Sequence, residues 1–169
     1  MKLPVMALIC SAALAWPLTA PAAGGGDGGG AGGPSSAAAA VHNSDPDYQA
    51  GMEAVNRKDW QQVAVSMDAY IKRKPDDADA WTQLGHAQRL TGKVDTAFES
   101  YGSALKINPK HRGAHEYLGE AYLQVGDVAR AEQELKVLDG LCFFSCEEYR
   151  DLKAKIAEYK KTKQVSSGS

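Results

Sequence analysis

Two cysteines near the end of the chain are spaced so that they could form a disulfide or bind a soft metal. Cys142 and Cys146 enclose Phe-Phe-Ser. In an oxidising compartment two nearby cysteines pair, whereas reduced thiolates bind Cu(I). A helix predicted to begin at Cys146 would stabilise its thiolate. The spacing leaves both interpretations open: a structural disulfide, which we favour, and a copper or thiol-redox carrier with His111 or His115 as a further ligand.

Glu116 and Glu120 are the carboxylate pair that most resembles a general acid and base, because four residues separate them on one predicted helix. Exposed like charges at this spacing are more typical of a surface or a binding face. No Gly-rich phosphate loop, nucleophile elbow or HExxH motif is present in the sequence. The sequence therefore predicts no enzyme and no cofactor.

The composition indicates one ordinary domain. The chain has 169 residues, 44% of them hydrophobic, with 19 basic against 21 acidic residues and a net charge of −2. This near balance argues against a nucleic-acid partner, which normally requires a basic surface.

The first 43 residues are predicted to lie outside the folded domain. Residues 1–23 combine Lys2, a short apolar run and an Ala-Pro-Ala sequence at 20–22, which is typical of a Sec-type signal peptide. Residues 24–43 are rich in glycine and alanine and are expected to form a flexible linker. We therefore expect a periplasmic or secreted protein with no stable membrane insertion after cleavage.

A 34-residue period runs through the rest of the chain. It separates Gly85 from Gly119, Gly92 from Gly126 and Pro75 from Pro109. Such a period is typical of stacked supersecondary units. Within each unit the apolar residues recur at helical spacing on both sides of a turn, which predicts two helices per unit.

The second unit resembles the tetratricopeptide repeat family through Trp81, Leu84, Gly85, Gly92, Ala97, Tyr101, Ala104 and Pro109. The third unit is a good match, with His115 in the place of Trp and Phe143 in the place of Pro. The first unit is degenerate and has Lys58 at the turn glycine. The resemblance implies an all-α solenoid of three repeats at 44–77, 78–111 and 112–145.

A capping helix is predicted at 146–163, followed by a disordered tail at 164–169. Tyr149, Leu152, Ile156 and Tyr159 would cover the last repeat. Ser145 and Glu148 have the spacing of a capping box, which would mark the start of this helix.

The family resemblance implies that a peptide or helix of another protein binds across a concave groove lined by the first helix of each repeat. The residues carried over to this groove are Tyr48, Met52, Asn56, Thr82, His86, Arg89, Glu116, Glu120 and Gln124. A basic client segment would face Glu116 and Glu120. The family's carboxylate clamp for C-terminal peptides is not expected, because Tyr48, Met52, Gly113 and Tyr117 replace its residues. Self-association stays open as a further possibility.

Overall fold

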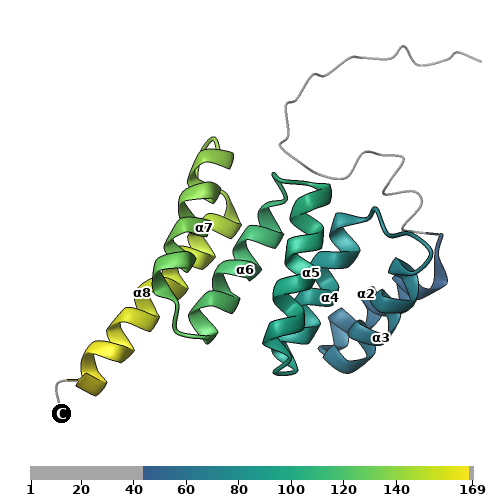
Figure 1. Ribbon diagram of the computed structural model, residues 1–169, viewed down its shortest axis with the longest axis horizontal. Coiled ribbons are helices and arrows are strands. Elements are labelled where there is room, and N and C mark those ends of the chain that lie inside the picture. The colour runs from purple at the N-terminus through teal and green to yellow at the C-terminus, as the bar shows by residue number, and fades with distance from the viewer. Residues whose placement is uncertain (1–43, 168–169) are drawn as a thin grey trace, which may run out of the picture.

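The computed structural model describes residues 44–167, with side chains up to residue 163. The helices in this range are α2 (Pro46–Arg57), α3 (Trp60–Ile71), α4 (Ala78–Leu90), α5 (Val94–Ile107), α6 (Arg112–Gln124), α7 (Val128–Leu141) and α8 (Glu147–Ser167). They form three packed pairs that stack into a short solenoid ending in α8 (Figure 1). The predicted all-α solenoid is therefore confirmed. The predicted signal peptide and linker lie outside the described residues.

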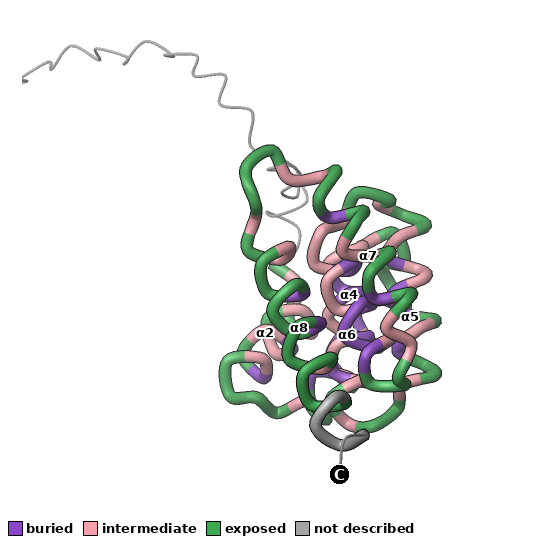
Figure 2. The backbone as a smooth tube through the Cα atoms, turned by 90° about the vertical axis from the view of Figure 1, so that its left-hand side faces the viewer, coloured by how far each residue is buried: buried purple, intermediate pink, exposed green. Residues whose placement is uncertain are grey.

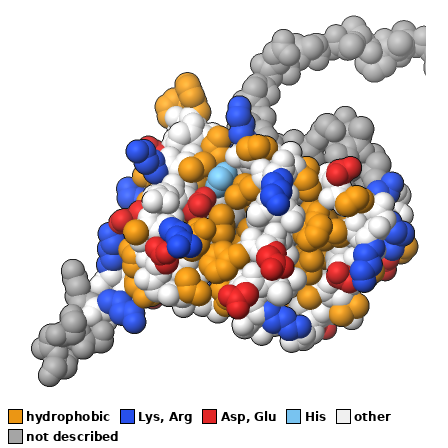
Figure 3. Space-filling model, viewed as in Figure 1, with side chains coloured by type: hydrophobic (Ala, Val, Ile, Leu, Met, Phe, Trp, Pro, Cys, Tyr) orange, Lys and Arg blue, Asp and Glu red, His pale blue; other side chains and the backbone are white. Residues whose placement is uncertain are grey.

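Charged side chains of both signs are interspersed over the face drawn in Figure 3, and hydrophobic side chains show between the rows of helices. None of the described helices has the length and hydropathy that a membrane span requires.

The turn inside each helix pair places one residue in the left-handed region. Gly92 and Gly126 have φ of 82° and 85°, and Lys58, the equivalent residue of the first pair, has φ of 58°. Glycine reaches this region without a Cβ clash. The same turn thus forms in the first unit although its glycine is missing, with the extra cost of a side chain on a left-handed residue.

Close helix approach explains the small residues at one position of each first helix. A Cβ on Gly51 would lie 2.6 Å from Met67 Cε, and a Cβ on Gly85 would lie 2.6 Å from Tyr101 Cε1. Met67 and Tyr101 belong to the second helix of the same pair. A Cβ on Gly119 would instead meet Leu152 of α8, at 2.5 Å. Helix α8 therefore packs closely against α6.

The predicted apolar face of α8 is confirmed. Leu152 and Ile156 are buried with Leu123, Ala131 and Leu138, while the opposite side of α8 is exposed (Figure 2). The helix continues to Ser167, beyond the predicted end at 163, because nothing in residues 164–167 breaks it.

His115 reproduces a hydrogen bond that tryptophan makes in the preceding repeat. Trp81 Nε1–H donates to the carbonyl of Pro75 at 2.8 Å, and His115 Nε2 lies 3.0 Å from the carbonyl of Pro109. His115 Nδ1 lies 2.7 Å from Glu134 of α7. Both ring nitrogens face acceptors, so the imidazolium form satisfies both contacts. Burial alone would lower the pKa of His115, but Glu134 and the Pro109 carbonyl outweigh it and raise the pKa.

We expect His115 to make stability depend on pH. Its pKa is raised in the folded state, so its contribution is complete below the unfolded value of about 6.5 and is lost as the pH rises through the folded value. In His115→Trp the bond to Pro109 can persist without a titrating group. The loss of stability with rising pH should then disappear from urea unfolding measured from about pH 6 upward.

Both proteins in this comparison carry Glu116→Gln, because Glu116 also titrates near neutrality and would add its own pH dependence. An unchanged pH dependence in His115→Trp would contradict the assignment of the imidazolium.

Candidate functional site

The predicted groove residues all lie on the first helices α2, α4 and α6, and we call this set the first-helix face. Their exposure differs. Asn56 and Gln124 are exposed, Thr82 and Glu120 are buried, and the remaining members are partly buried: Tyr48, Met52, His86, Arg89 and Glu116.

Two members of the face are unavailable to a partner, which corrects the prediction. Thr82 is 2% exposed, and its hydroxyl donates to the Ala78 carbonyl at 2.7 Å. Glu120 is 6% exposed and pairs with Arg89 of α4 and Lys155 of α8. Helical spacing identifies the side of a helix but not what a later helix places over it. The acidic end of the groove is therefore smaller than predicted.

Arg89, Glu120 and Lys155 form a charged triad that joins three helices. The Arg89 side chain is 10% exposed, and that of Lys155 is 49% exposed. Burying Glu120 without partners would cost several kcal/mol, so the two cations are needed for this arrangement. The triad neutralises Arg89, so this predicted groove residue does not offer a free basic group to a client.

Glu116 lies one turn before Glu120 and is the carboxylate that remains available. Burial raises its pKa to about 7, with further contributions from the carboxylates of Glu120, Asp151 and Glu148; Lys155 acts in the opposite direction. Glu148 is itself paired with Arg112 at 3.4 Å. Glu116 makes no ion pair with another residue of the described part of the chain. A cation brought to Glu116 would therefore stabilise its charged form.

Three rings from three helices form an aromatic stack beside this carboxylate. His86 stacks on Trp60 with a centroid distance of 5.1 Å and meets Tyr117 edge to face at 4.1 Å. Burial, Arg89 and Lys155 lower the pKa of His86 to about 4, so the imidazole is neutral at pH 7. Burial and Glu116 raise the pKa of Tyr117 to about 12.

Sequence reasoning did not select Trp60, and it considered Tyr117 only as a replacement for a clamp residue. The stack was missed because its members come from α3, α4 and α6, and no spacing along the chain relates them.

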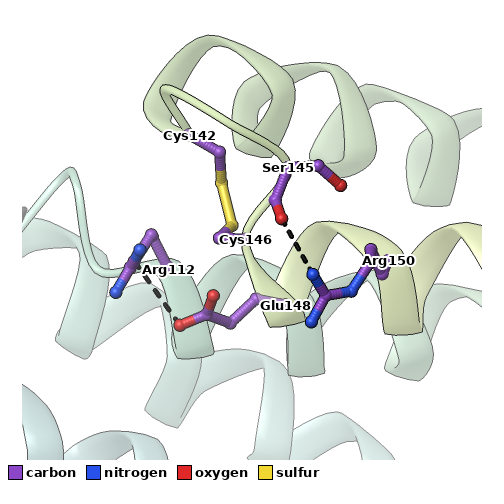
Figure 4. The surroundings of a disulfide bond; sticks show 6 residues. All are labelled: Arg112, Cys142, Ser145, Cys146, Glu148 and Arg150. Carbon is purple, nitrogen blue, oxygen red and sulfur yellow. Dashed lines mark hydrogen bonds and ion pairs between the residues drawn. A yellow bond between two sulfur atoms is a disulfide. The ribbon is translucent and has the colours of Figure 1, made fainter.

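The cysteine pair is a disulfide in the structure, with the two Cα atoms 5.5 Å apart (Figure 4). The predicted capping box is wrong. Helix α8 begins at Glu147, Ser145 has φ of 45°, and its carbonyl accepts a hydrogen bond from the Arg150 side chain at 3.1 Å. Glu148 pairs with Arg112 instead of capping the helix. The disulfide places the turn, and the helix starts one residue later than the motif predicts.

The geometry does not favour the metal-carrier interpretation. His111 Nδ1 accepts from the Ala114 amide at 3.0 Å, and its Nε2 lies 2.8 Å from Asp79. His115 is held by Glu134 and Pro109. Neither imidazole has a nitrogen free to join the cysteine sulfurs. The described residues contain no cluster of three or more histidine, cysteine or acidic side chains that could hold a metal ion.

Comparison with known families agrees with the repeat architecture. Two family models, both described as tetratricopeptide repeat, match residues 48–111 and 89–156. The chain is a tetratricopeptide repeat protein. Together the two matches include all three helix pairs and the first part of α8.

A solved structure with the same fold is the type III secretion translocator chaperone SycD of Yersinia enterocolitica. It has a TM-score of 0.62 at 18% identity, covering 78% of this chain and 97% of SycD. SycD in complex with a peptide of the translocator YopD has a TM-score of 0.59, also at 18% identity, covering 72% and 92% of the two chains. At this identity the likeness shows the tetratricopeptide fold.

Curated relatives match over short segments. The peroxisomal targeting signal receptor of Saccharomyces cerevisiae is 32% identical over 65 residues, which are 38% of this chain and 11% of the receptor. The cytochrome c-type biogenesis protein CcmH of Escherichia coli is 24% identical over 75 residues, which are 44% of this chain and 21% of CcmH. Both matches span less than a quarter of the relative.

Proposed function

We propose that this tetratricopeptide repeat protein is an exported, non-enzymatic adaptor that binds a peptide or helix of another protein across its first-helix face. The observation that carries the proposal is Glu116, a partly buried carboxylate without an ion pair among the described residues, next to the aromatic stack. The related fold of SycD, solved with a peptide of YopD, supports a peptide as the ligand.

The chemistry of the face favours a client with an apolar end and a basic segment. Tyr48 and Met52 pack on the core of the first repeat and are partly exposed, so they offer an apolar anchor. At the other end, Glu116 lies among carboxylates and would gain from a lysine or arginine of the client. The face between them carries the neutral His86 ring, which does not repel a cation.

Export is supported by the sequence of residues 1–23 and by the composition of residues 24–43. We propose a periplasmic location on these grounds. The match to CcmH, a protein named for cytochrome c-type biogenesis, agrees with such a location but covers too little of that relative to transfer its role.

Reversing the charge of Glu116 should separate binding from folding. Glu116→Lys places a cation near Glu120, Asp151 and Glu148, so we expect the fold to be kept or stabilised. The new charge should repel a basic client segment and lower client capture at least about tenfold. Capture is measured in cells with a photo-crosslinking residue at Asn56, which is exposed on α2.

The matched control is Glu99→Lys, at an exposed position on α5 away from the first helices. It should leave the Asn56 crosslink unchanged. Undiminished capture by Glu116→Lys would refute the basic-client assignment. In a separate experiment the photo-crosslinking residue is placed at position 99 instead of position 56. If it captures as much client there, the first-helix face is not the binding site. The double change of Glu116 and Glu120 to lysine, which the sequence alone suggests, is unsuitable because it would break the charged triad.

A further inference from the structure

The turn between α7 and α8 differs from the two turns that precede it in the repeat. The α3–α4 turn carries Pro75, and the α5–α6 turn carries Pro109 at the equivalent position. Both proline carbonyls accept a ring N–H from the following helix. In the third turn Phe143 stands at the proline position and Phe144 follows it. The two earlier turns form without phenylalanine, so the turn itself does not explain why Phe143 and Phe144 are present.

Phe143 and Phe144 are almost fully exposed, at 91% and 86%. Their rings contact each other edge to face, with centroids 4.6 Å apart, and neither residue belongs to a core cluster of the described chain. Removing both rings from water would be favourable, yet the fold leaves them outside. Solubility and packing within the chain give no reason for this placement.

The backbone that carries the two rings is held in place covalently and by polar contacts. The Cys142–Cys146 disulfide closes the loop (Figure 4). The Arg150 side chain donates to the Ser145 carbonyl, and Arg112 pairs with Glu148 at the start of α8. We call residues 142–146 the aromatic tip. Its constrained backbone loses little conformational freedom when the rings are buried by a partner.

We propose that the aromatic tip inserts reversibly into the interfacial region of an anionic bilayer, so that the repeat protein works at a membrane surface. The two phenylalanine rings would enter the boundary between headgroups and acyl chains, while the solenoid stays in water. This contact is peripheral and does not require a spanning helix, in agreement with the helices described. It is independent of the binding proposed for the first-helix face.

The size and surroundings of the tip favour a bilayer over a protein partner. A stable protein interface requires a broad patch of about 800 Å² on each side, whereas the residues that follow the tip, Glu147 and Arg150, are exposed and charged. A protruding apolar tip with a charged border fits an interface in which the border remains among the headgroups.

Charge at this end of the solenoid favours anionic lipid. The α3–α4 and α5–α6 turns and the α7–α8 turn that carries the tip lie at the same end of the solenoid, because each repeat is an antiparallel helix pair. Lys106 and Lys110, at the neighbouring turn, are exposed and make no ion pair with another described residue. Asp139, on the last turn of α7, and Glu147 are exposed carboxylates that offset most of this charge. We therefore expect ring insertion to supply most of the affinity and anionic lipid to raise it by only about twofold.

Fluorine NMR of the full chain tests the proposal at each ring. The chain has three phenylalanines, Phe98, Phe143 and Phe144, so 4-fluorophenylalanine gives three signals, assigned with the Phe143→Ser and Phe144→Ser variants. Phe98 is partly buried on α5 and packs on Tyr122, which makes it the internal control. The probe is a vesicle of phosphatidylcholine with about a third phosphatidylglycerol, carrying a doxyl-labelled lipid.

We expect the doxyl lipid to broaden the two tip signals at least about fivefold more than the Phe98 signal, and less so in vesicles of phosphatidylcholine alone. Equal broadening of all three signals, or none, would overturn the proposal, even where another segment of the chain binds the vesicle. Shifts of the tip signals that depend on protein concentration without lipid would assign the tip to a second copy of the chain and also overturn it.

Discussion

Glu120→Ala is expected to destabilise the protein by about 3 kcal/mol, the lower end of the range for breaking a buried ion pair. The variant leaves the Arg89 side chain, which is 10% exposed, without its carboxylate. Lys155 can turn toward water because it is about half exposed, and Glu116, one turn away, can supply part of the missing charge. Urea unfolding followed by circular dichroism at pH 7 measures the loss.

Glu116→Ala is the matched control on the same helix. Its carboxyl has a pKa of about 7 and no ion pair among the described residues, so ionisation of Glu116 lowers the free energy of unfolding. We expect a change within about 0.5 kcal/mol at pH 7, or a small gain. Equal losses in the two alanine variants would show that the triad with Arg89 and Lys155 contributes nothing specific.

Tyr101→Ala is expected to cost about 3–5 kcal/mol, as for other large-to-small changes at fully buried aromatic positions. Tyr101 is 0% exposed and packs with Ala97, Leu118 and Ala121 between the second and third helix pairs. The cavity would loosen the contact between these pairs. Chemical unfolding should show the loss together with a reduced unfolding cooperativity, since repeat proteins depend on the coupling between neighbours.

Tyr101→Phe separates the ring from its hydroxyl. The hydroxyl is buried beside Arg89 without a well-formed hydrogen bond, so its removal should be nearly neutral. Gly85→Ala tests the contact from the other side, because its Cβ would lie 2.6 Å from the Tyr101 ring. It should destabilise the wild type more than the Tyr101→Ala variant, with a coupling of at least about 0.5 kcal/mol. Additive effects would contradict this contact.

Local rules were sufficient for most of the fold. The 34-residue period predicted the pairing of helices, and Gly92 and Gly126 marked turns whose positive φ the structure confirms. Gly85 and Tyr101 belong to the repeat pattern, and the structure shows that they lie in close contact. The local rule failed at Ser145, where the capping motif was correct in spacing but the disulfide holds the turn in a different conformation.

Long-range placement decided which candidate site residues are accessible. Helix α8 brings Lys155 to Glu120 and thereby removes Glu120 and Arg89 from the predicted groove. The aromatic stack of Trp60, His86 and Tyr117 also depends on three helices meeting. No spacing within one helix indicates these contacts. The sequence pattern therefore could not show which side chains are paired with another helix and which are available to a partner.

The sequence by itself determined the helices, their 34-residue repetition and the small residues at their contacts, because helical periodicity, turn glycines and close packing depend on residues near one another or on the repeat itself. The tertiary structure alone decided the raised pKa values of Glu116 and His115, the burial of Glu120, and the exposure of Phe143 and Phe144. Burial and pairing depend on what other helices place around a side chain, and that arrangement exists only once the solenoid and α8 have packed.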